Sequence, residues 1–455
     1  MKKYVAIALA ATIAVSGTVA IVLSRDTRPV LKVANWAEYI DTGDEEAGTR
    51  SLILEFEDWY KEKTGKEIRV EYSTADDNET LYTMIKMGDQ FDLVCPSEYM
   101  IMKLAAENRL LKLPDWFFDK TNPDNYYVNN VSPYIERTFK NNYMQGEAEN
   151  ESWSEYAAGY MWGTTGFVYN PEYVDITDVQ TWSVFTNVDY AQKITAKNNI
   201  RDTYFAGLAI HYETELQALK ADYLASAKQE SDLLAYQRSL SDLMNDATEN
   251  TMDAVKPKLK ALASNLYGFE TDAGKDDMIA GKLHINYQWS GDAVYIMDYA
   301  QGDGDEETGK EPLYLNYCIP DTVSNLWFDG WVLPNTCQNV EAAVMFINFL
   351  SMPQNAVRNM EYIGYTSCIA DDYVFENYVK TYYEAEDDDT TAVPYDLSYY
   401  FGENHIIQTP AEQLNRQLFA QYPDEDTLYR CVAMQYFNRE ENTRANLMWS
   451  DITFF

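Results

Sequence analysis

The segment from Leu31 to Cys95 alternates between strand-like and helix-like patterns, and this order limits the folds open to the chain. Leu31–Asn35 is a short apolar strand, Ile68–Tyr72 alternates as a strand does, and Phe91–Cys95 is an apolar run typical of a buried parallel strand. Parallel strands need long crossover connections, which are usually helices. The segment therefore predicts an open α/β sheet, whose ligands bind beyond the carboxyl ends of the strands.

Helix start and stop signals lie between these strands. Thr49 or Ser51 is expected to cap a first helix that ends at Gly65. Asn78 is expected to cap a second helix that stops near Gly88. Each helix carries apolar residues at helical spacing, so each should pack against the sheet.

The rest of the chain contains longer elements. Residues 114–155 are polar and aromatic with several prolines, and they are expected to form a surface excursion. Tyr160–Asn170 is an extended apolar stretch expected to cross from one lobe to another, and Trp327–Leu333 is a strand expected to carry the chain back. A helical layer is predicted at 213–265, and a further strand at Leu283–Trp289. With 455 residues the chain is too long for one compact core, so two lobes are expected.

Residues 1–30 are predicted to be an export segment. Lys2 and Lys3 precede Val5–Leu23, which as a helix would span about 28 Å, close to the thickness of the hydrocarbon core. The run is either a cleaved signal peptide or an uncleaved anchor in the membrane, with equal support for both. In either case we expect the body of the protein to be exported, to the periplasm or the extracellular face of the cytoplasmic membrane.

The charge balance excludes some classes of partner. The chain has 73 acidic and 35 basic residues and a formal charge of −38. Nucleic acids and anionic lipid surfaces require basic surface, so neither is an expected partner. The field would attract a cationic ligand, although most of these carboxylates are expected only to keep the protein soluble.

Metal ligands and reactive thiols are not evident. The three histidines, His211, His284 and His405, are too scattered for a zinc or iron site, and no cofactor is expected. The five cysteines form no CxxC motif. They are expected to be buried thiols, with at most one disulfide whose partners the sequence does not identify.

Tryptophan and a carboxylate lie close together at three expected strand ends. These pairs are Trp36 with Glu38, Trp289 with Asp292, and Trp327 with Asp329. An aromatic face attracts an ammonium group and a carboxylate neutralises it, so these pairs predict a cage for an organic cation. Core packing is the competing explanation for each single tryptophan.

Several short segments, in a fixed order, identify a family that the chain resembles. They are NWAEY at 35–39, YST…NETLYTMIK at 72–86, FDLVCPSEYM at 91–100, YMWGTTGFVYN at 160–170, WSGDA at 289–293, FDGWVLP at 328–334, INFLSMPQNA at 347–356 and EYIGYTS at 361–367. The chain resembles the spermidine/putrescine-binding proteins of polyamine ABC importers, which are extracellular solute-binding proteins. The likeness is weak in the long helical region and in the last eighty residues.

The resemblance implies a bilobal fold of the periplasmic-binding-protein type (type II), with two open α/β lobes joined by crossover strands and preceded by the N-terminal hydrophobic helix. It assigns 31–165 and 330–375 to lobe 1 and 166–329 to lobe 2. Residues 376–455 would be a C-terminal helical segment packed on the lobes.

The resemblance also implies which residues contact the ligand. They are Trp36, Tyr39, Ser97, Tyr99, Asp202, Trp289, Asp292, Trp327, Asp329 and Tyr365. Asn199 stands where spermidine-preferring relatives have an aspartate, whereas Asp292 matches an acid of putrescine-preferring relatives. The preferred polyamine therefore stays open.

The implied function is a monomeric, non-enzymatic binding protein that delivers a polyamine to an ABC permease and its ATPase. An uncleaved N-terminal segment would add a contact with the membrane. One alternative is an exported glycoside hydrolase, because aromatic platforms and paired carboxylates also suit that chemistry. Another alternative keeps the fold but binds a different cation, a sugar, or an amino acid, for which Arg201 would receive the carboxylate.

Overall fold

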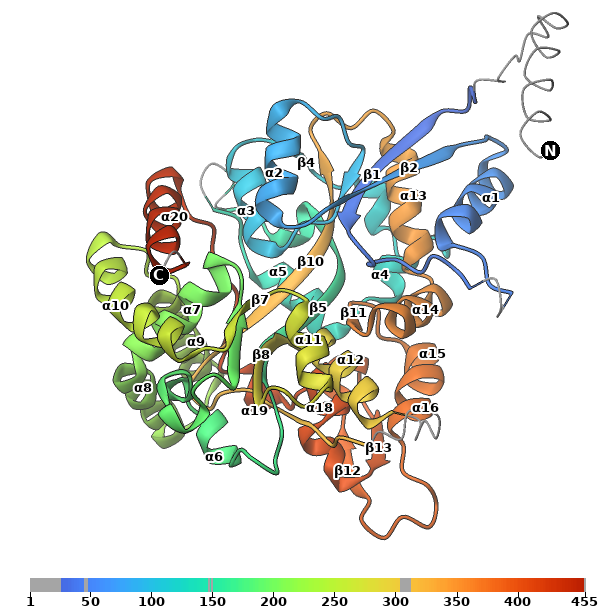
Figure 1. The fold of residues 1–455 in the computed structure, drawn as a ribbon. Helices are drawn as coiled ribbons and strands as arrows, with labels where there is room; N and C mark the ends of the chain where they lie inside the picture. The colour runs from blue at the N-terminus through green and yellow to red at the C-terminus, as the bar shows by residue number, and fades with distance from the viewer. Residues whose placement is uncertain (1–25, 45–47, 146–147, 149, 303–311, 454–455) are drawn as a thin grey trace, which may run out of the picture.

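The computed structural model describes residues 26–44, 48–145, 148, 150–302 and 312–453 (Figure 1). The predicted signal peptide or anchor falls on residues 1–25 and so lies outside the described residues. Over the described part of the chain, no helix combines the length and apolar character needed to cross a membrane.

The described strands form one large mixed sheet and one separate pair. The main sheet contains β1 (Val30–Trp36), β2 (Arg69–Ala75), β3 (Leu93–Val94), β4 (Leu110–Leu111), β5 (Ala157–Tyr169), β6 (Ile194–Lys197), β7 (Gly268–Glu270), β8 (Ile285–Trp289), β9 (Asn316–Cys318), β10 (Ser324–Pro334), β11 (Thr366–Ser367) and β14 (Cys431–Val432). Its central order is β2-β1-β3-β10-β5-β8-β6-β7. β12 (Val393–Asp396) and β13 (Ile406–Thr409) pair with each other.

Helices surround this sheet (Figure 1). They are α1 (Leu52–Thr64), α2 (Asn78–Met87), α3 (Glu98–Ala106), α4 (Tyr126–Asn130), α5 (Pro133–Asn141), α6 (Ile176–Val179), α7 (Ile200–His211), α8 (Glu213–Ala225), α9 (Glu230–Met244), α10 (Glu249–Asn265), α11 (Ala273–Ile279), α12 (Ser290–Gln301), α13 (Val340–Leu350), α14 (Pro353–Ile363), α15 (Asp372–Val374), α16 (Lys380–Tyr383), α17 (Ser398–Phe401), α18 (Gln417–Gln421), α19 (Glu425–Leu428) and α20 (Arg439–Thr453). The helical layer predicted at 213–265 is confirmed as α8, α9 and α10.

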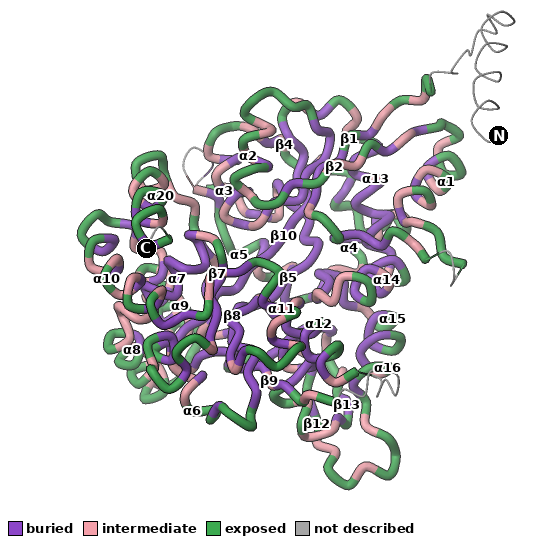
Figure 2. The backbone as a smooth tube through the Cα atoms, in the orientation of Figure 1, coloured by how far each residue is buried: buried purple, intermediate pink, exposed green. Residues whose placement is uncertain are grey.

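Two long antiparallel strands, β5 and β10, run through the centre of the molecule and are buried along their whole length (Figure 2). β5 pairs with β11 near its start and with β8 and β9 near its end. β10 pairs with β3 and β4 towards its own end. These two strands are the ones predicted at Tyr160–Asn170 and Trp327–Leu333, and they connect the two halves of the sheet.

The predicted α/β order at the N-terminal side is confirmed, with one correction. Ser51 caps α1 by accepting a hydrogen bond from the Ile53 amide, and Gly65 ends the helix in the left-handed conformation. The cap of α2 is Asp77 and not Asn78, because the Asp77 carboxylate accepts from the Thr80 amide. Asn78 instead directs its side chain to Ser97, where it bonds both the hydroxyl and the amide.

Residues 114–155 are not the surface excursion that their polarity predicted. α5 buries Tyr134, Ile135 and Phe139, and Trp153 packs edge-on against Phe139. The apolar positions of this segment therefore cover the sheet. All five cysteines are buried and free, so the allowance for one disulfide was wrong.

The C-terminal residues pack on the body of the structure. α20 lies against α10, α18 lies against α12, and β14 extends the sheet beside β10. The boundaries predicted for the lobes and for the C-terminal segment stay predictions.

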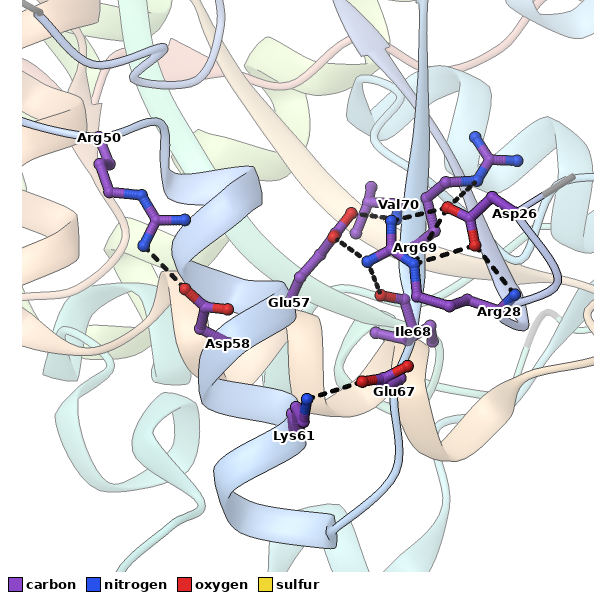
Figure 3. Close-up of polar contacts among 10 residues, drawn as sticks. All are labelled: Asp26, Arg28, Arg50, Glu57, Asp58, Lys61, Glu67, Ile68, Arg69 and Val70. Atoms are coloured by element: carbon purple, nitrogen blue, oxygen red, sulfur yellow. Dashed lines mark hydrogen bonds and ion pairs between the residues drawn. The ribbon is translucent and has the colours of Figure 1, made fainter. Parts of the chain in front are cut away.

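The start of the described chain is fastened to α1 by charged groups (Figure 3). Arg28 bonds Glu57 at 2.7 Å and the Ile68 carbonyl at 3.2 Å, and Glu57 accepts from the Val70 amide. Arg28, Glu57 and Ile68 help to line a surface groove of about 320 Å³ with Asp58, Lys61 and Glu67. Because its charges already pair with one another, this groove is a poor candidate for a ligand site.

Phe56 provides a test of the packing of α1. Its ring is fully buried and lies 4.9 Å from Phe346 and 5.7 Å from Phe349, measured between ring centroids. We expect Phe56→Ala to lower the free energy of unfolding by about 3–5 kcal/mol, because it leaves a cavity. Leu54→Ala, on the exposed side of the same helix, should cost about 0.5 kcal/mol or less. Urea denaturation checks both values, and equal losses would contradict this packing.

Candidate functional site

The predicted ligand residues lie where strands end. Trp36 is the last residue of β1, Ser97 follows β3 at the start of α3, and Trp289 is the last residue of β8. Asp202 lies in the first turn of α7, which follows β6. The carboxyl ends of strands in α/β sheets are the usual ligand crevice, so this placement supports a shared site.

Asp329 of β10 forms the centre of one group. Its carboxylate accepts hydrogen bonds from the Tyr39 hydroxyl at 2.8 Å and the Ser97 hydroxyl at 2.7 Å. Burial raises the pKa of Asp329 to about 6, and hydrogen bonds from Ser97, Tyr39 and Trp36 oppose that rise. No lysine or arginine of the described chain pairs with this carboxylate.

Three aromatic rings stand beside Asp329. Tyr365 lies 5.5 Å from Tyr39 and 5.4 Å from Trp327, measured between ring centroids. Trp327 donates its indole N–H to the Thr164 carbonyl. The rings are therefore fixed by contacts with one another and with β5.

A glycine makes room for this group of rings. A Cβ atom added to Gly291, in α12, would lie 1.1 Å from Cδ1 of Tyr365. The absence of a side chain at Gly291 thus lets Tyr365 reach Trp327, and it links α12 to the group around Asp329.

Asp292 lies one residue further along α12 and already has a cationic partner. The Lys275 ammonium is 3.5 Å from its carboxylate, and the same lysine bonds Asp272. Burial, and after it the Asp292 charge, raise the pKa of the Tyr365 hydroxyl well above its usual value. Asp292 therefore connects the aromatic group with the lysine of α11.

Asp202 and Trp289 form a second group. The side-chain Nδ2 of Asn199 donates to the Asp202 carboxylate at 2.7 Å, and the side-chain Oδ1 of Asn199 accepts from the backbone N–H of Asp202. Burial raises the pKa of Asp202, whereas Asn199, the Lys197 charge and Trp289 lower it. The Lys197 ammonium lies 3.8 Å from the centroid of the Trp289 ring.

Tyr99 lies beside two charged side chains of the protein. Its hydroxyl is 3.3 Å from the Glu79 carboxylate, and the Arg201 guanidinium lies 4.6 Å from the centre of its ring. Arg201 also covers the ring of Phe437 at 3.7 Å. Tyr99 therefore stacks on a cation of the protein, which leaves one side of its ring unavailable to a ligand.

The structure thus brings seven of the ten predicted residues together around Asp329 and Asp292, places Asp202 with Trp289, and puts Tyr99 against Glu79 and Arg201, but it leaves Glu38 apart. Glu38 is exposed and has a positive φ of 53° in the turn that carries Tyr39 inwards. Glu98 was not predicted, although it is buried beside Asp329 and accepts from the Phe328 amide at 3.0 Å. Burial raises the pKa of Glu98 to about 8, so its carboxyl is mostly protonated at neutral pH.

Lys197 and Lys275 were also missed. Lys197 ends the short strand Ile194–Lys197, whose other residues carry no charge, and this is a weak sign in the sequence that its ammonium is enclosed. The arrangement as a whole offers carboxylates and ring faces, a set of groups suited to a cation. Among the described residues no cluster of histidine, cysteine and acidic side chains is able to hold a metal ion.

Comparison with known proteins identifies the chain's relatives. The sequence profile of the bacterial extracellular solute-binding proteins matches residues 56–377. The spermidine/putrescine-binding periplasmic protein of Salmonella typhimurium is 25% identical over 334 residues, which cover 73% of this chain and 75% of that protein. The putrescine-binding periplasmic protein SpuD of Pseudomonas aeruginosa is 26% identical over 361 residues, or 78% and 82% of the two chains.

A solved structure has the same fold. The spermidine/putrescine ABC transporter substrate-binding protein PotD of Streptococcus pneumoniae superposes with a TM-score of 0.57 at 24% identity, over 94% of this chain and 99% of that one. The predicted bilobal α/β class is therefore confirmed.

Gly291 provides a test of the aromatic group. In a helix, alanine normally stabilises by up to about 1 kcal/mol relative to glycine. Here the new methyl group would overlap Tyr365, so we expect Gly291→Ala to destabilise the protein by about 1–3 kcal/mol or more. Gly268→Ala is the control, because nothing lies within 4 Å of its added Cβ. Thermal denaturation compares the two variants, and a stabilised Gly291→Ala protein would disprove the contact.

Proposed function

The chain belongs to the bacterial extracellular solute-binding protein family, and we propose that it binds a polyamine outside the cytoplasm and delivers it to an ABC importer. The curated relatives named above, at 25% and 26% identity, are spermidine/putrescine- and putrescine-binding periplasmic proteins. They support a binding protein over an exported glycoside hydrolase. They also support the periplasmic side of the membrane as the place where this chain acts.

The observation that carries the proposal is the carboxylate of Asp329. It is buried, its hydrogen-bond donors are neutral, and aromatic rings stand beside it. A buried carboxylate without a cationic partner is costly to keep ionised. An ammonium group bound there would supply the missing charge, and the methylenes of a polyamine would pack on Tyr365 and Trp327.

The remaining residues complete the proposed site. Ser97 and Tyr39 orient the carboxylate of Asp329, and Trp36 adds a further hydrogen bond. Asp292, Asp202 and Trp289 would line the side formed by α12, β8 and α7, and Tyr99 would add a ring at the start of α3. None of these contacts requires a chemical change in the ligand, as expected for a carrier.

The proposed partner is the permease of the importer together with its ATPase. Ligand binding would favour a closed arrangement of the two lobes, and the permease would recognise that arrangement. The carrier is proposed to act as a monomer. If the N-terminal segment is retained, it would keep the carrier at the membrane.

Replacement of Asp329 is the direct test of the site. We expect Asp329→Asn to weaken polyamine binding by about 1.5–3 kcal/mol, because a hydrogen bond to a charged group is lost while the side chain keeps its shape. Asp292→Asn should have a smaller effect, since Lys275 already pairs with that carboxylate. Calorimetric titration of residues 31–455 with putrescine and spermidine measures both. Asp58→Asn, an exposed acid of α1, is the control, and unchanged affinity in Asp329→Asn would remove that residue from the site.

The raised pKa of Asp329 predicts a pH dependence. Its pKa is about 6, and an ammonium ion binds the ionised carboxylate. Affinity should therefore fall about tenfold for each pH unit below 6 and stay level above it until Glu98 titrates near 8. In the ligand-free protein, the folding stability contributed by Asp329 changes with pH in the opposite direction to the ligand affinity. Because the folded pKa lies above the usual value of 3.8, the stability contribution of Asp329 is complete below that value and is lost as the pH rises through 6.

Calorimetry in two buffers of different ionisation enthalpy detects the protons released on binding at about pH 5.5. Asp329→Asn is the matched control, because it should lose both the proton release and the pH dependence. An affinity that is the same on both sides of pH 6 in the unmodified protein would contradict the role given to Asp329.

A further inference from the structure

The site contains an ammonium group of the protein itself. Lys197 is fully buried at the end of β6. Its Nζ atom donates to Gln288 Oε1 at 2.6 Å and to the Thr271 carbonyl at 3.0 Å, and it lies 3.9 Å from the Glu270 carboxylate. A buried ammonium that has this many partners is held in one position.

The same ammonium group lies over one face of the Trp289 ring. Its distance of 3.8 Å from the ring centroid is that of a close cation–π contact. Gln288 Oε1 also accepts from the Trp289 amide at 3.0 Å, so one side-chain oxygen fixes both the lysine and the backbone of the tryptophan. A ligand ammonium approaching this ring would find one face taken, or would face a like charge across the ring.

The charges of two lysines also act on the acids on this side. The positive charge of Lys197 lowers the pKa of Asp202, and Lys275 lies 3.5 Å from Asp292. Of the three carboxylates in the proposed site, Asp329 alone has neutral partners only among the described residues. Asp329 is therefore the carboxylate of the site for which an enclosed ligand ammonium would supply the only counter-charge among the described residues.

We propose that Lys197 restricts the site to short amines that bury a single ammonium group, and that a four-carbon diamine binds in preference to a triamine or a tetraamine. This inference rests on the proposed function. The ammonium group at one end binds Asp329, and the other end lies towards Asp292, whose carboxylate is partly exposed. A triamine would bring a further ammonium group towards Lys197 and be repelled.

The first experiment uses the unmodified protein. We expect putrescine to bind at least about tenfold more tightly than spermidine in calorimetric titrations at neutral pH, since like charges at short range in a buried site repel strongly. Spermidine binding tenfold more tightly than putrescine would overturn the inference and leave the proposed function intact. Binding of no polyamine at all would overturn both.

The second experiment removes the resident charge. Lys197→Met keeps a flexible side chain of similar length and should shift the ratio of the putrescine and spermidine affinities by about tenfold in favour of spermidine. Lys193→Met is the matched control, because Lys193 lies just before the same strand and its ammonium bonds only the Lys282 carbonyl at the surface. The control should leave the ratio unchanged. An unchanged ratio in folded Lys197→Met would overturn the inference.

Lys197→Met leaves Glu270 and Asp202 without their shared cation, so its folding is checked by circular dichroism. If it fails to fold, Lys197→Arg replaces it. The arginine keeps the charge and should keep the preference for putrescine. Loss of that preference in the arginine variant, with the protein folded, would also overturn the role of the charge.

Discussion

A carboxylate enclosed without a counter-charge is the constraint on which much of this structure depends. Asp329 lies on a central strand that is buried along its length, and the residue is only 5% exposed. The hydroxyls of Tyr39 and Ser97 donate hydrogen bonds to the Asp329 carboxylate and so orient it. They come from different parts of the sheet edge, because Tyr39 follows β1 and Ser97 follows β3. Asn78 in turn holds Ser97, which gives the first helix after β2 a part in positioning the same carboxylate. The strand irregularity between Asp329 and Gly330 lies at this point as well.

The charges around Asp329 are arranged unevenly. On the side of α7, α11 and α12, lysines accompany the acids, and Arg201 lies over the ring of Tyr99. On the side of β1 and β3, neutral groups surround the carboxylate. The formal charge of −38 is therefore a poor guide to the site, because most of it lies on exposed side chains and the enclosed acids are mostly compensated. What distinguishes Asp329 is the absence of such compensation.

Patterns that act over a few residues predicted much of the fold. The caps at Ser51 and Gly65 are local, and so are the strand ends at Trp36 and Trp289 and the turn from β8 into α12 that places Asp292. Short spacing predicted the pairs of Trp289 with Asp292 and Trp327 with Asp329, and also Trp36, whereas the full set of ten proposed ligand residues came from a resemblance over many segments. Polarity misled at 114–155, because Tyr134 and Trp153 bury their rings while presenting polar neighbours to solvent. Lys197 was missed because its partners, Thr271 and Gln288, are 74 and 91 residues away in the chain.

The five free thiols have a consequence of their own. Each is buried, and burial raises the thiol pKa, to about 12 for Cys318, Cys337 and Cys431 and well above the usual value for Cys95 and Cys368. Such thiols stay protonated and unreactive while the protein is folded. An exported protein of this design needs no oxidant for maturation and is indifferent to reductants. The rate at which these thiols are alkylated would then report the rate or extent of unfolding, because the reagent reaches them only in molecules that have unfolded around them.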